Sequence, residues 1–228
     1  MKLLDEQTKK DIINWDISNW SKALDYWEKN IPLEDKKYKC LELGASCGGL
    51  SLWLALNRNK VICSDVQGPH KDARRLHEKY TCGDNIEYAA IDATAIPYEN
   101  HFDLIVFKSI LGGISSNNQD VYKKKTLDEI YKALKPGGIL LFAENLQGSF
   151  LHTALRKKFG TKNWNYLRLN EIDKIFSEYR SIEYTTVGFL GCLGRTENQR
   201  TVLGKIDTVL DKLLPGKYKY IAIGIAVK

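Results

Sequence analysis

The stretch Leu41-Glu42-Leu43-Gly44-Ala45-Ser46-Cys47-Gly48-Gly49-Leu50 indicates the kind of fold to expect. An apolar run over residues 38–43 leads into these small residues, and a helix-like segment over residues 50–57 follows directly. Glycines between a strand and a helix let a ligand come close to the backbone, and the start of the helix offers unpaired N–H groups to an anion. We therefore predict a ligand-binding turn between a buried strand and a helix.

Short apolar runs alternate with amphipathic segments along the rest of the chain. The apolar runs occupy residues 38–43, 61–64, 86–90, 102–107, 139–143, 182–187 and 218–227. Helix-like segments at residues 50–57, 70–79 and 119–134 lie among the first five runs. This order is typical of βαβ units whose parallel sheet is covered by helices on both faces. We predict a doubly wound α/β fold, with the last two runs added at the edge of the same sheet as a terminal strand pair.

The composition is that of a globular protein. Of 228 residues, 43% are hydrophobic and 27% are charged, and the formal net charge of +6 favours anionic partners without identifying a nucleic-acid binder. The apolar run at residues 220–227 is too short to span a bilayer, and the first ten residues, MKLLDEQTKK, are too charged for a secretory signal. Five cysteines without a C-x-x-C pair argue against a zinc ribbon or a disulfide framework. We therefore expect a cytoplasmic protein without stable membrane insertion.

Acidic residues mark the ends of the first three predicted strands. Asp65 lies 21 residues beyond Gly44, where a carboxylate can accept hydrogen bonds from both hydroxyls of a ribose, in NAD or in another adenosine cofactor. Asp92 could accept from an adenine amine, with the N–H of Ala93 near a ring nitrogen. Glu42 would repel a pyrophosphate and attract an ammonium group. These acids predict a nucleoside site that also holds an amino-acid moiety.

The motifs resemble those of class I S-adenosylmethionine-dependent methyltransferases. The resemblance covers roughly residues 38–145 and is carried by Glu42 to Gly49, Asp65, Ile91-Asp92-Ala93, Phe102 to Val106 and Leu134-Lys135-Pro136-Gly137-Gly138. It implies S-adenosylmethionine as cofactor and a seven-stranded, Rossmann-like, mostly parallel sheet with a terminal antiparallel strand. Pro136 is expected to end the helix before the fifth strand. Ser46 replaces the middle glycine of the family's G-x-G-x-G, which puts the local backbone geometry in doubt.

The resemblance also implies roles for individual residues. It places Glu42 near the methionine moiety, Asp65 at the ribose, and Asp92 with Ala93 at the adenine. It also implies that Lys108 and Ser109, just after the fourth strand, face the sulfonium end of the cofactor. The predicted cofactor-binding residues are Trp20, Glu42, Gly44, Ala45, Gly48, Asp65, Val66, Asp92, Ala93, Lys108 and Ser109.

We expect one domain over residues 1–228. An amphipathic helical cap over residues 1–35 precedes the cofactor-binding core at 38–145, an acceptor lid with a helix follows at 146–180, and the terminal strand pair occupies 182–228. A helical insert at residues 198–214 could pack on the core, dimerise or touch a membrane-bound substrate. The sequence leaves open whether the protein is a monomer or a homodimer.

The reaction that the resemblance implies is an in-line displacement, to which proximity and orientation contribute most. A hydroxyl acceptor would need a base. His152 is the candidate, with Glu144 and Asn145 as alternatives, because His70 and His77 are expected to face solvent and His101 precedes the fourth strand. Trp15 and Trp20 could stack on the acceptor, shield the sulfonium, or only bury the cap. The predicted substrate residues are Trp15, Glu144 and Asn145.

The acceptor is less well defined than the cofactor. Family members that methylate base amines carry N/D-P-P-Y/F after the fourth strand, whereas Lys108-Ser109-Ile110-Leu111 stands here, which argues against adenine or cytosine. Basic and aromatic residues over 150–179 could cradle RNA, cover an anionic or ring-shaped small molecule, or form a solvated helix face. We predict methyl transfer to a small molecule such as a glycan, a lipid-linked intermediate or a secondary metabolite. An RNA methyltransferase, a nicotinamide-dependent oxidoreductase and a non-catalytic S-adenosylmethionine-binding module remain as alternatives.

Overall fold

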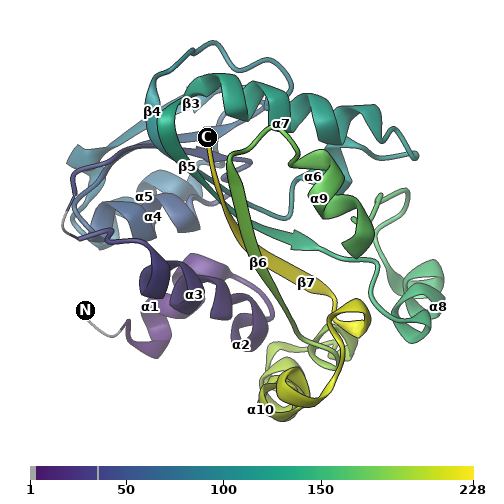
Figure 1. The fold of residues 1–228 in the computed structure, drawn as a ribbon. Helices are drawn as coiled ribbons and strands as arrows, with labels where there is room; N and C mark the ends of the chain where they lie inside the picture. Colours follow the sequence, from purple (N-terminus) through teal and green to yellow (C-terminus); the bar gives the residue numbers. More distant parts are fainter. Residues whose placement is uncertain (1–3, 35) are drawn as a thin grey trace.

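A mixed β-sheet forms the centre of the molecule (Figure 1). The computed structural model describes residues 4–34 and 36–228, so residues 1–3 and 35 of the predicted cap lie outside the described residues. Within them the sheet has seven strands in the order β3-β2-β1-β4-β5-β7-β6. The strands are β1 (Lys39–Leu43), β2 (Lys60–Asp65), β3 (Ile86–Ala90), β4 (Phe102–Lys108), β5 (Leu134–Asn145), β6 (Ser181–Val187) and β7 (Ile221–Val227).

The direction of the strands confirms the predicted doubly wound arrangement. Strands β1 to β5 are parallel where they pair, and β7 runs antiparallel between β5 and β6. The terminal pair therefore extends the same sheet. Strand β6 forms the edge, and the last strand, β7, lies between β6 and β5. The carboxyl ends of β1, β2, β3, β4 and β5 consequently meet at one edge, where doubly wound folds bind ligands.

Helices cover both faces of the sheet. One face carries α1 (Glu6–Ile13), α3 (Lys22–Asn30), α4 (Gly49–Leu56) and α5 (Asp72–Lys79), and the other carries α6 (Leu111–Ile114), α7 (Val121–Ala133) and α9 (Ile172–Ile175) (Figure 1). Alternate strand residues supply the two cores. Cys40 and Leu104 are buried under the first group of helices, whereas Leu41 and Ile105 are buried under the second.

The N-terminal cap is a chain of short helices. In its described part α1 is followed by α2 (Ile17–Trp20) and then α3, with left-handed residues at Asn14 (φ 71°) and Asp16 (φ 45°) between α1 and α2. The cap packs so closely on α4 that a Cβ atom at Gly49 would lie 1.9 Å from the carbonyl oxygen of Ile12. Only a glycine permits this approach, so Gly49 belongs to the packing of the cap.

Helix α7 ends shortly before Pro136, in agreement with the prediction. The helix ends at Ala133, and the next residue, Leu134, is extended, fully buried and paired with Phe102 of β4. Pro136 follows two residues after Leu134, a position where proline is common because it cannot continue a helix. The register of β5 on β4 then shifts, and Gly137 lies in this irregular segment with φ 75°.

The remaining helices lie beyond the carboxyl edge of the sheet. They are α8 (Phe150–Phe159), after β5, and α10 (Glu197–Leu213), between β6 and β7 (Figure 1). Helix α10 packs on the cap through Gly204, whose Cβ would lie 2.4 Å from Ser18, and through buried Asp207. Its apolar row is exposed and consists of Val202, Ile206, Val209 and Leu213. Helix α10 therefore packs on the rest of the protein, which is one of the three placements expected for the insert. It does so through its other side, because the apolar row remains exposed to solvent. No helix within the described ranges is long and apolar enough to cross a membrane.

Candidate functional site

The turn after β1 adopts the conformation that its small residues predict. Gly44 (φ 64°), Ser46 (φ 48°) and Gly48 (φ 74°) are all left-handed. Ser46 thus keeps a backbone conformation that glycine adopts freely, at a cost of roughly 1–2 kcal/mol for a residue with a Cβ atom. Ser46, at the position of the family's middle glycine, therefore shares the left-handed backbone conformation of Gly44 and Gly48. Gly44 is exposed at its start, while Ala45 and Gly48 are buried within it.

Asp65 connects the end of β2 to this turn. Its carboxylate accepts hydrogen bonds from the backbone N–H of Ser46 (2.9 Å) and of Val66 (2.8 Å). Each carboxylate oxygen accepts one of these bonds and keeps a further lone pair. The neighbouring Val66 side chain is 64% exposed. Asp65 is therefore oriented by the backbone and still able to accept from a ligand.

Asp92 lies at the same edge, after β3. It is exposed, and one carboxylate oxygen accepts from the N–H and the hydroxyl of Thr94, both at 2.8 Å. Because β1, β2 and β3 are parallel neighbours, the predicted adenosine-binding residues meet along one edge. We call this group the cofactor ledge; it consists of Gly44, Asp65, Val66, Asp92 and Ala93.

Glu42, which is predicted to lie near the methionine moiety, is buried near the carboxyl end of β1 beside the start of α4. Its carboxylate is 4% exposed and accepts hydrogen bonds from the N–H groups of Leu50 (3.2 Å) and Ser51 (2.7 Å) and from the Ser51 hydroxyl (2.5 Å). Burial raises its pKa to about 7, against the effect of these bonds. Glu42 therefore accepts the hydrogen bonds that the start of α4 donates, while its Oε1 accepts only the bond from Leu50 and keeps a further lone pair.

His77 is placed differently from the expectation. Its ring is fully buried and bridges the carbonyl oxygen of Gly48 (2.9 Å from Nε2) and the hydroxyl of Tyr88 (2.7 Å from Nδ1). The predicted solvent-facing position of His77 is wrong because helix α5 turns this side chain under the Gly44–Gly48 turn. His70 is exposed, as expected.

Lys108, at the end of β4, lies under the cap. Its ammonium donates to the carbonyl oxygen of Ile13 (3.0 Å) and lies 5.7 Å and 5.3 Å from the ring centroids of Trp15 and Trp20. Burial lowers its pKa to about 8, and the charges of Glu42 and Asp16 oppose that shift. The two tryptophan rings pack against each other with centroids 5.3 Å apart. Trp20 is fully buried. It therefore has no exposed surface with which to make the predicted contact with a cofactor.

The loop after β4 is held by Glu144. This fully buried carboxylate accepts from the N–H groups of Ile110 (2.9 Å), Leu111 (2.8 Å) and Asn145 (2.8 Å), and burial raises its pKa to about 7. Because its buried oxygens accept backbone N–H groups, Glu144 positions the loop. The structure therefore argues against the predicted contact of Glu144 with substrate. The next side chain, Asn145, donates to the hydroxyl of Ser109.

A cavity of about 770 Å³ opens beside Ser109 and Asn145, which follow β4 and end β5. We call it the acceptor cavity. Its walls come from the cap, the loop after β4, the end of β5, helix α8 with the chain that follows it, and the segment between β6 and α10. The lining residues are Trp15, Ser109, Asn145, His152, Leu155, Arg156, Phe159, Gly160, Thr161, Trp164, Tyr166, Cys192, Leu193, Gly194, Arg195 and Arg200.

His152 lies at the acceptor cavity, but both of its ring nitrogens are already hydrogen-bonded to the protein. It lines the acceptor cavity as predicted, but its Nδ1 accepts from the N–H of Ser149 (2.9 Å) and its Nε2 lies 2.7 Å from the carbonyl oxygen of Phe189. These bonds require the neutral tautomer with hydrogen on Nε2, and burial lowers the pKa further. His152 therefore caps α8 and joins it to the chain after β6, and the structure argues against its prediction as a base.

Sequence reasoning missed one wall of the cavity. Residues 192–195 and Arg200 line it. Residues 192–195 follow β6 and Arg200 belongs to the predicted helical insert, and neither was predicted to contact the acceptor. A glycine-containing segment with two arginines was the one local signal. His101, in contrast, lines a different cavity together with Lys39 and Lys60, at the amino ends of the strands, as expected.

Comparisons with known proteins agree with this geometry. A family model described as a methyltransferase domain matches residues 40–138. A ubiquinone/menaquinone biosynthesis C-methyltransferase of Pseudoalteromonas translucida is 30% identical over 138 residues, which cover 58% of this chain and 51% of that protein. The protein of the same name from Francisella tularensis subsp. novicida is 34% identical over 91 residues, covering 38% and 33%. The chain thus spans between about a third and a half of these curated relatives.

Solved structures share the fold over nearly the whole chain. Phosphoethanolamine N-methyltransferase 2 of Haemonchus contortus, in complex with S-adenosyl-L-methionine, has a TM-score of 0.65 at 18% identity, covering 97% of this chain and 56% of that one. A putative sarcosine dimethylglycine methyltransferase from Galdieria sulphuraria has a TM-score of 0.60 at 15% identity, covering 98% and 91%. At such identities the similarity shows the fold.

Proposed function

The chain belongs to the class I S-adenosylmethionine-dependent methyltransferases, and on that premise we propose that it methylates a small molecule bound in the acceptor cavity. The observation that carries the proposal is the position of this cavity. It opens at the carboxyl ends of β4 and β5, next to the cofactor ledge on β1 to β3. A volume of about 770 Å³ is in the range of small-molecule sites.

The residues of the cofactor ledge fit S-adenosylmethionine. Gly44 is exposed at the start of the turn, and the free lone pairs of Asp65 suit ribose hydroxyls. The exposed Val66 side chain offers an apolar surface to a purine ring, and exposed Asp92 offers an acceptor for its amine. When bound, the cofactor supplies a methyl group that the positive charge on its sulfur has already activated.

Lys108 has a role that differs from the one the resemblance implies. An ammonium group repels a sulfonium and attracts a carboxylate. We therefore propose that Lys108 binds the carboxylate of the methionine moiety, in place of facing its sulfur. The contacts of Lys108 with Ile13, Trp15 and Trp20 connect this end of the site to the cap.

The chain's own contribution to the reaction is then orientation and exclusion of water. Glu144 fixes the loop after β4 through its backbone bonds, and Asn145 holds the Ser109 hydroxyl at the cavity wall. Trp15 covers the cavity from the side of the cap. Positioning of this kind can supply on the order of 7–11 kcal/mol of a barrier. The curated relatives are named C-methyltransferases, which favours a carbon atom of a ring compound as the methylated position.

Cofactor binding and methyl transfer test the proposal separately. S-adenosylhomocysteine at a hundred times its Kd should raise the free energy of unfolding by about 2.7 kcal/mol, while NAD should not. With methyl-labelled S-adenosylmethionine, the label should enter a small molecule of a cell extract. Label in RNA would indicate the alternative acceptor, and binding without labelling of any fraction would indicate a binding module. Stabilisation by NAD in place of S-adenosylhomocysteine would overturn the proposal.

A further inference from the structure

We propose that the acceptor is a planar ring compound carrying a negative charge, and that the guanidinium groups lining the acceptor cavity bind that charge. This inference rests on the proposed function, because it concerns the occupant of the same cavity. It is carried by the charges of the cavity wall, by the fixed orientation of one arginine, and by the aromatic side chains between the arginines.

The wall of the acceptor cavity is positively charged. Arg156, Arg195 and Arg200 line it, and no aspartate or glutamate is among its described lining residues. Arg200 has a partner outside the wall, because its guanidinium lies 3.5 Å from the carboxylate of Glu197, which itself accepts from two backbone N–H groups of the cap. In the part of the chain that the structure describes, neither Arg156 nor Arg195 forms a salt bridge. Two cationic groups of the wall are therefore without a counter-charge.

Arg156 is held in one orientation by neutral partners. One of its terminal nitrogens, Nη1, donates to the carbonyl oxygens of Leu146 (2.6 Å) and Gln147 (3.0 Å), and the guanidinium lies 4.0 Å from the ring centroid of Tyr166. Burial lowers the pKa of Arg156, but a guanidinium stays charged in a protein. Holding a half-buried charge beside neutral groups is unfavourable unless an anion joins it. A carboxylate or phosphate has the planar or branched oxygen groups that an arginine binds best.

Aromatic side chains make up much of the remaining wall. Trp15, Phe159, Trp164 and Tyr166 line the cavity, and the Arg195 guanidinium lies 5.4 Å from the ring centroid of Phe159. Trp164 rests directly on α6, since a Cβ atom at Gly112 would lie 2.1 Å from its indole nitrogen. Flat side chains at fixed positions favour a ring-shaped ligand by stacking. A cavity of about 770 Å³ suits a small molecule rather than an RNA chain.

Calorimetry with a matched pair of probes tests the charge without any turnover. The probes are 2-naphthoate and 2-naphthamide, which share the ring and differ in charge, added to protein saturated with S-adenosylhomocysteine. We expect 2-naphthoate to bind about tenfold more tightly than the amide or better, and salt to weaken only the binding of 2-naphthoate. Arg156→Gln and Arg195→Gln should each raise the Kd of 2-naphthoate about three- to thirtyfold and leave the Kd of the amide unchanged.

Lys157→Gln is the matched control, because Lys157 is exposed on the same helix α8 and does not line the cavity. It removes the same charge and should leave both Kd values unchanged. Arg195 is exposed, so its variant tests the proposal even if Arg156→Gln does not fold. Equal affinity for the two probes, binding of neither, or an unchanged Kd in Arg195→Gln would each overturn the inference.

Labelling of fractionated extract separates this inference from the proposed function. A cell extract is divided by anion exchange, and each fraction is incubated with methyl-labelled S-adenosylmethionine. Label in the retained, anionic small molecules supports the inference. Label in the unretained fraction, or in RNA, overturns it. Absence of label from every fraction counts against the proposed function, while the calorimetry still decides whether the cavity selects anions.

Discussion

Replacement of Asp65 by alanine should weaken cofactor binding strongly and stability weakly. The Asp65 carboxylate is already oriented by the N–H groups of Ser46 and Val66, at 2.9 Å and 2.8 Å, and each of its oxygens can accept once more. A hydrogen bond from a ribose hydroxyl to such a charged group contributes about 1.5–3 kcal/mol. Since 1.4 kcal/mol corresponds to a factor of about ten in Kd, Asp65→Ala should raise the Kd of S-adenosylhomocysteine about ten- to hundredfold.

The fold should tolerate this change. Ser46 and Val66 are exposed, so water can replace the lost carboxylate at both N–H groups. The expected loss in the free energy of unfolding is therefore below about 1 kcal/mol. Isothermal titration calorimetry gives the Kd, and urea unfolding gives the stability of the same preparation.

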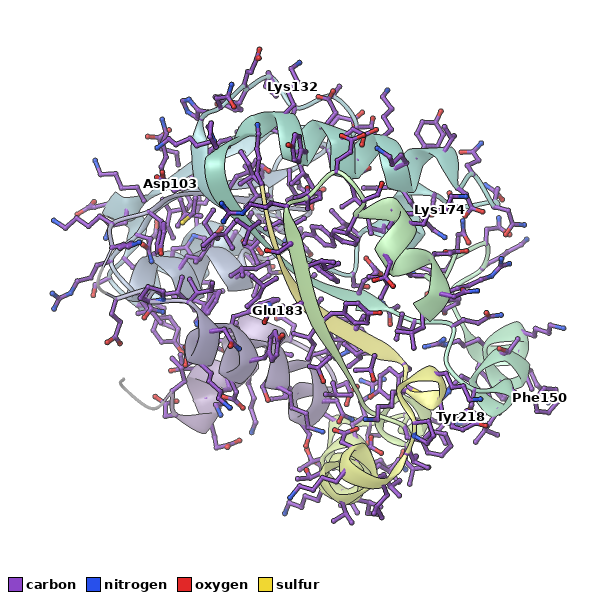
Figure 2. All side chains as sticks on the ribbon, viewed as in Figure 1. Asp103, Lys132, Phe150, Lys174, Glu183 and Tyr218 are labelled. Atoms are coloured by element: carbon purple, nitrogen blue, oxygen red, sulfur yellow. The ribbon has the colours of Figure 1, made fainter. Side chains whose placement is uncertain are left out.

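Asp103 provides the control. It lies in β4 near its amino end, where it accepts from the backbone N–H of Lys39 (2.8 Å) and pairs with the ammonium of Lys135 (2.6 Å). Figure 2 shows Asp103 far across the molecule from Phe150 of α8. Asp103→Ala should therefore lower stability by up to about 1 kcal/mol and leave the Kd unchanged. An unchanged Kd in Asp65→Ala, with Asp103→Ala behaving the same way, would refute the assignment of β2 to ribose binding.

Other predictions concern the cap, a buried acid and the histidine beside the cavity. Gly49→Ala should destabilise the protein by about 1–3 kcal/mol, because its Cβ would lie 1.9 Å from the carbonyl oxygen of Ile12; Gly83→Ala, with open space around it, should be nearly neutral in the same thermal unfolding assay. Burial raises the pKa of Glu144 to about 7 from 4.5, so the folded protein binds its proton more tightly than the unfolded chain. The stability that this protonation contributes is complete below pH about 4.5 and is lost as the pH rises through about 7, a change of about 3 kcal/mol. In a series of urea titrations Glu144→Gln should lower this pH dependence by the share of Glu144 and leave the share of Glu42, whose pKa is also raised to about 7; an unaltered slope would contradict the assignment. His152→Ala should cost about 2–4 kcal/mol of stability through its lost bonds to Ser149 and Phe189. The pH profile of methyl transfer should keep its shape; loss of an inflection near neutral pH would restore His152 as the base.

The layout of the sheet was predictable because its signals are local. Each of these signals depends only on residues close to it in the sequence. They are the apolar runs of strand length, the glycines Gly44 and Gly48, and the acids Asp65 and Asp92. The rule that parallel strands meet at their carboxyl ends then brings them together without knowledge of side-chain packing. The parallel order and the cofactor edge followed from these features.

Charged side chains near the strand ends were harder to interpret. Glu42 and Glu144 both look like ligand-binding carboxylates in the sequence, yet both accept backbone N–H groups of neighbouring loops and helices. A sequence pattern gives the position of a carboxylate, but it does not say whether the nearest donor belongs to a ligand or to the protein. His77 and His152 differ from expectation for the same reason, since their partners Gly48 and Phe189 are 29 and 37 residues away along the chain.

The sequence by itself determined the doubly wound sheet, the turn at Gly44 and the edge at which we propose that a nucleoside cofactor binds, because strand periodicity and glycine conformations are properties of short segments. Only the tertiary structure decided the shape and charge of the acceptor cavity. Its wall joins Trp15 of the cap, Arg156 of α8 and Arg195 before α10, which lie far apart in the sequence. Which of these side chains meet depends on how the cap, α8 and α10 pack at the end of the sheet, and that packing is settled by long-range contacts such as those of Gly204 with Ser18 and of Glu197 with the backbone of Asp16.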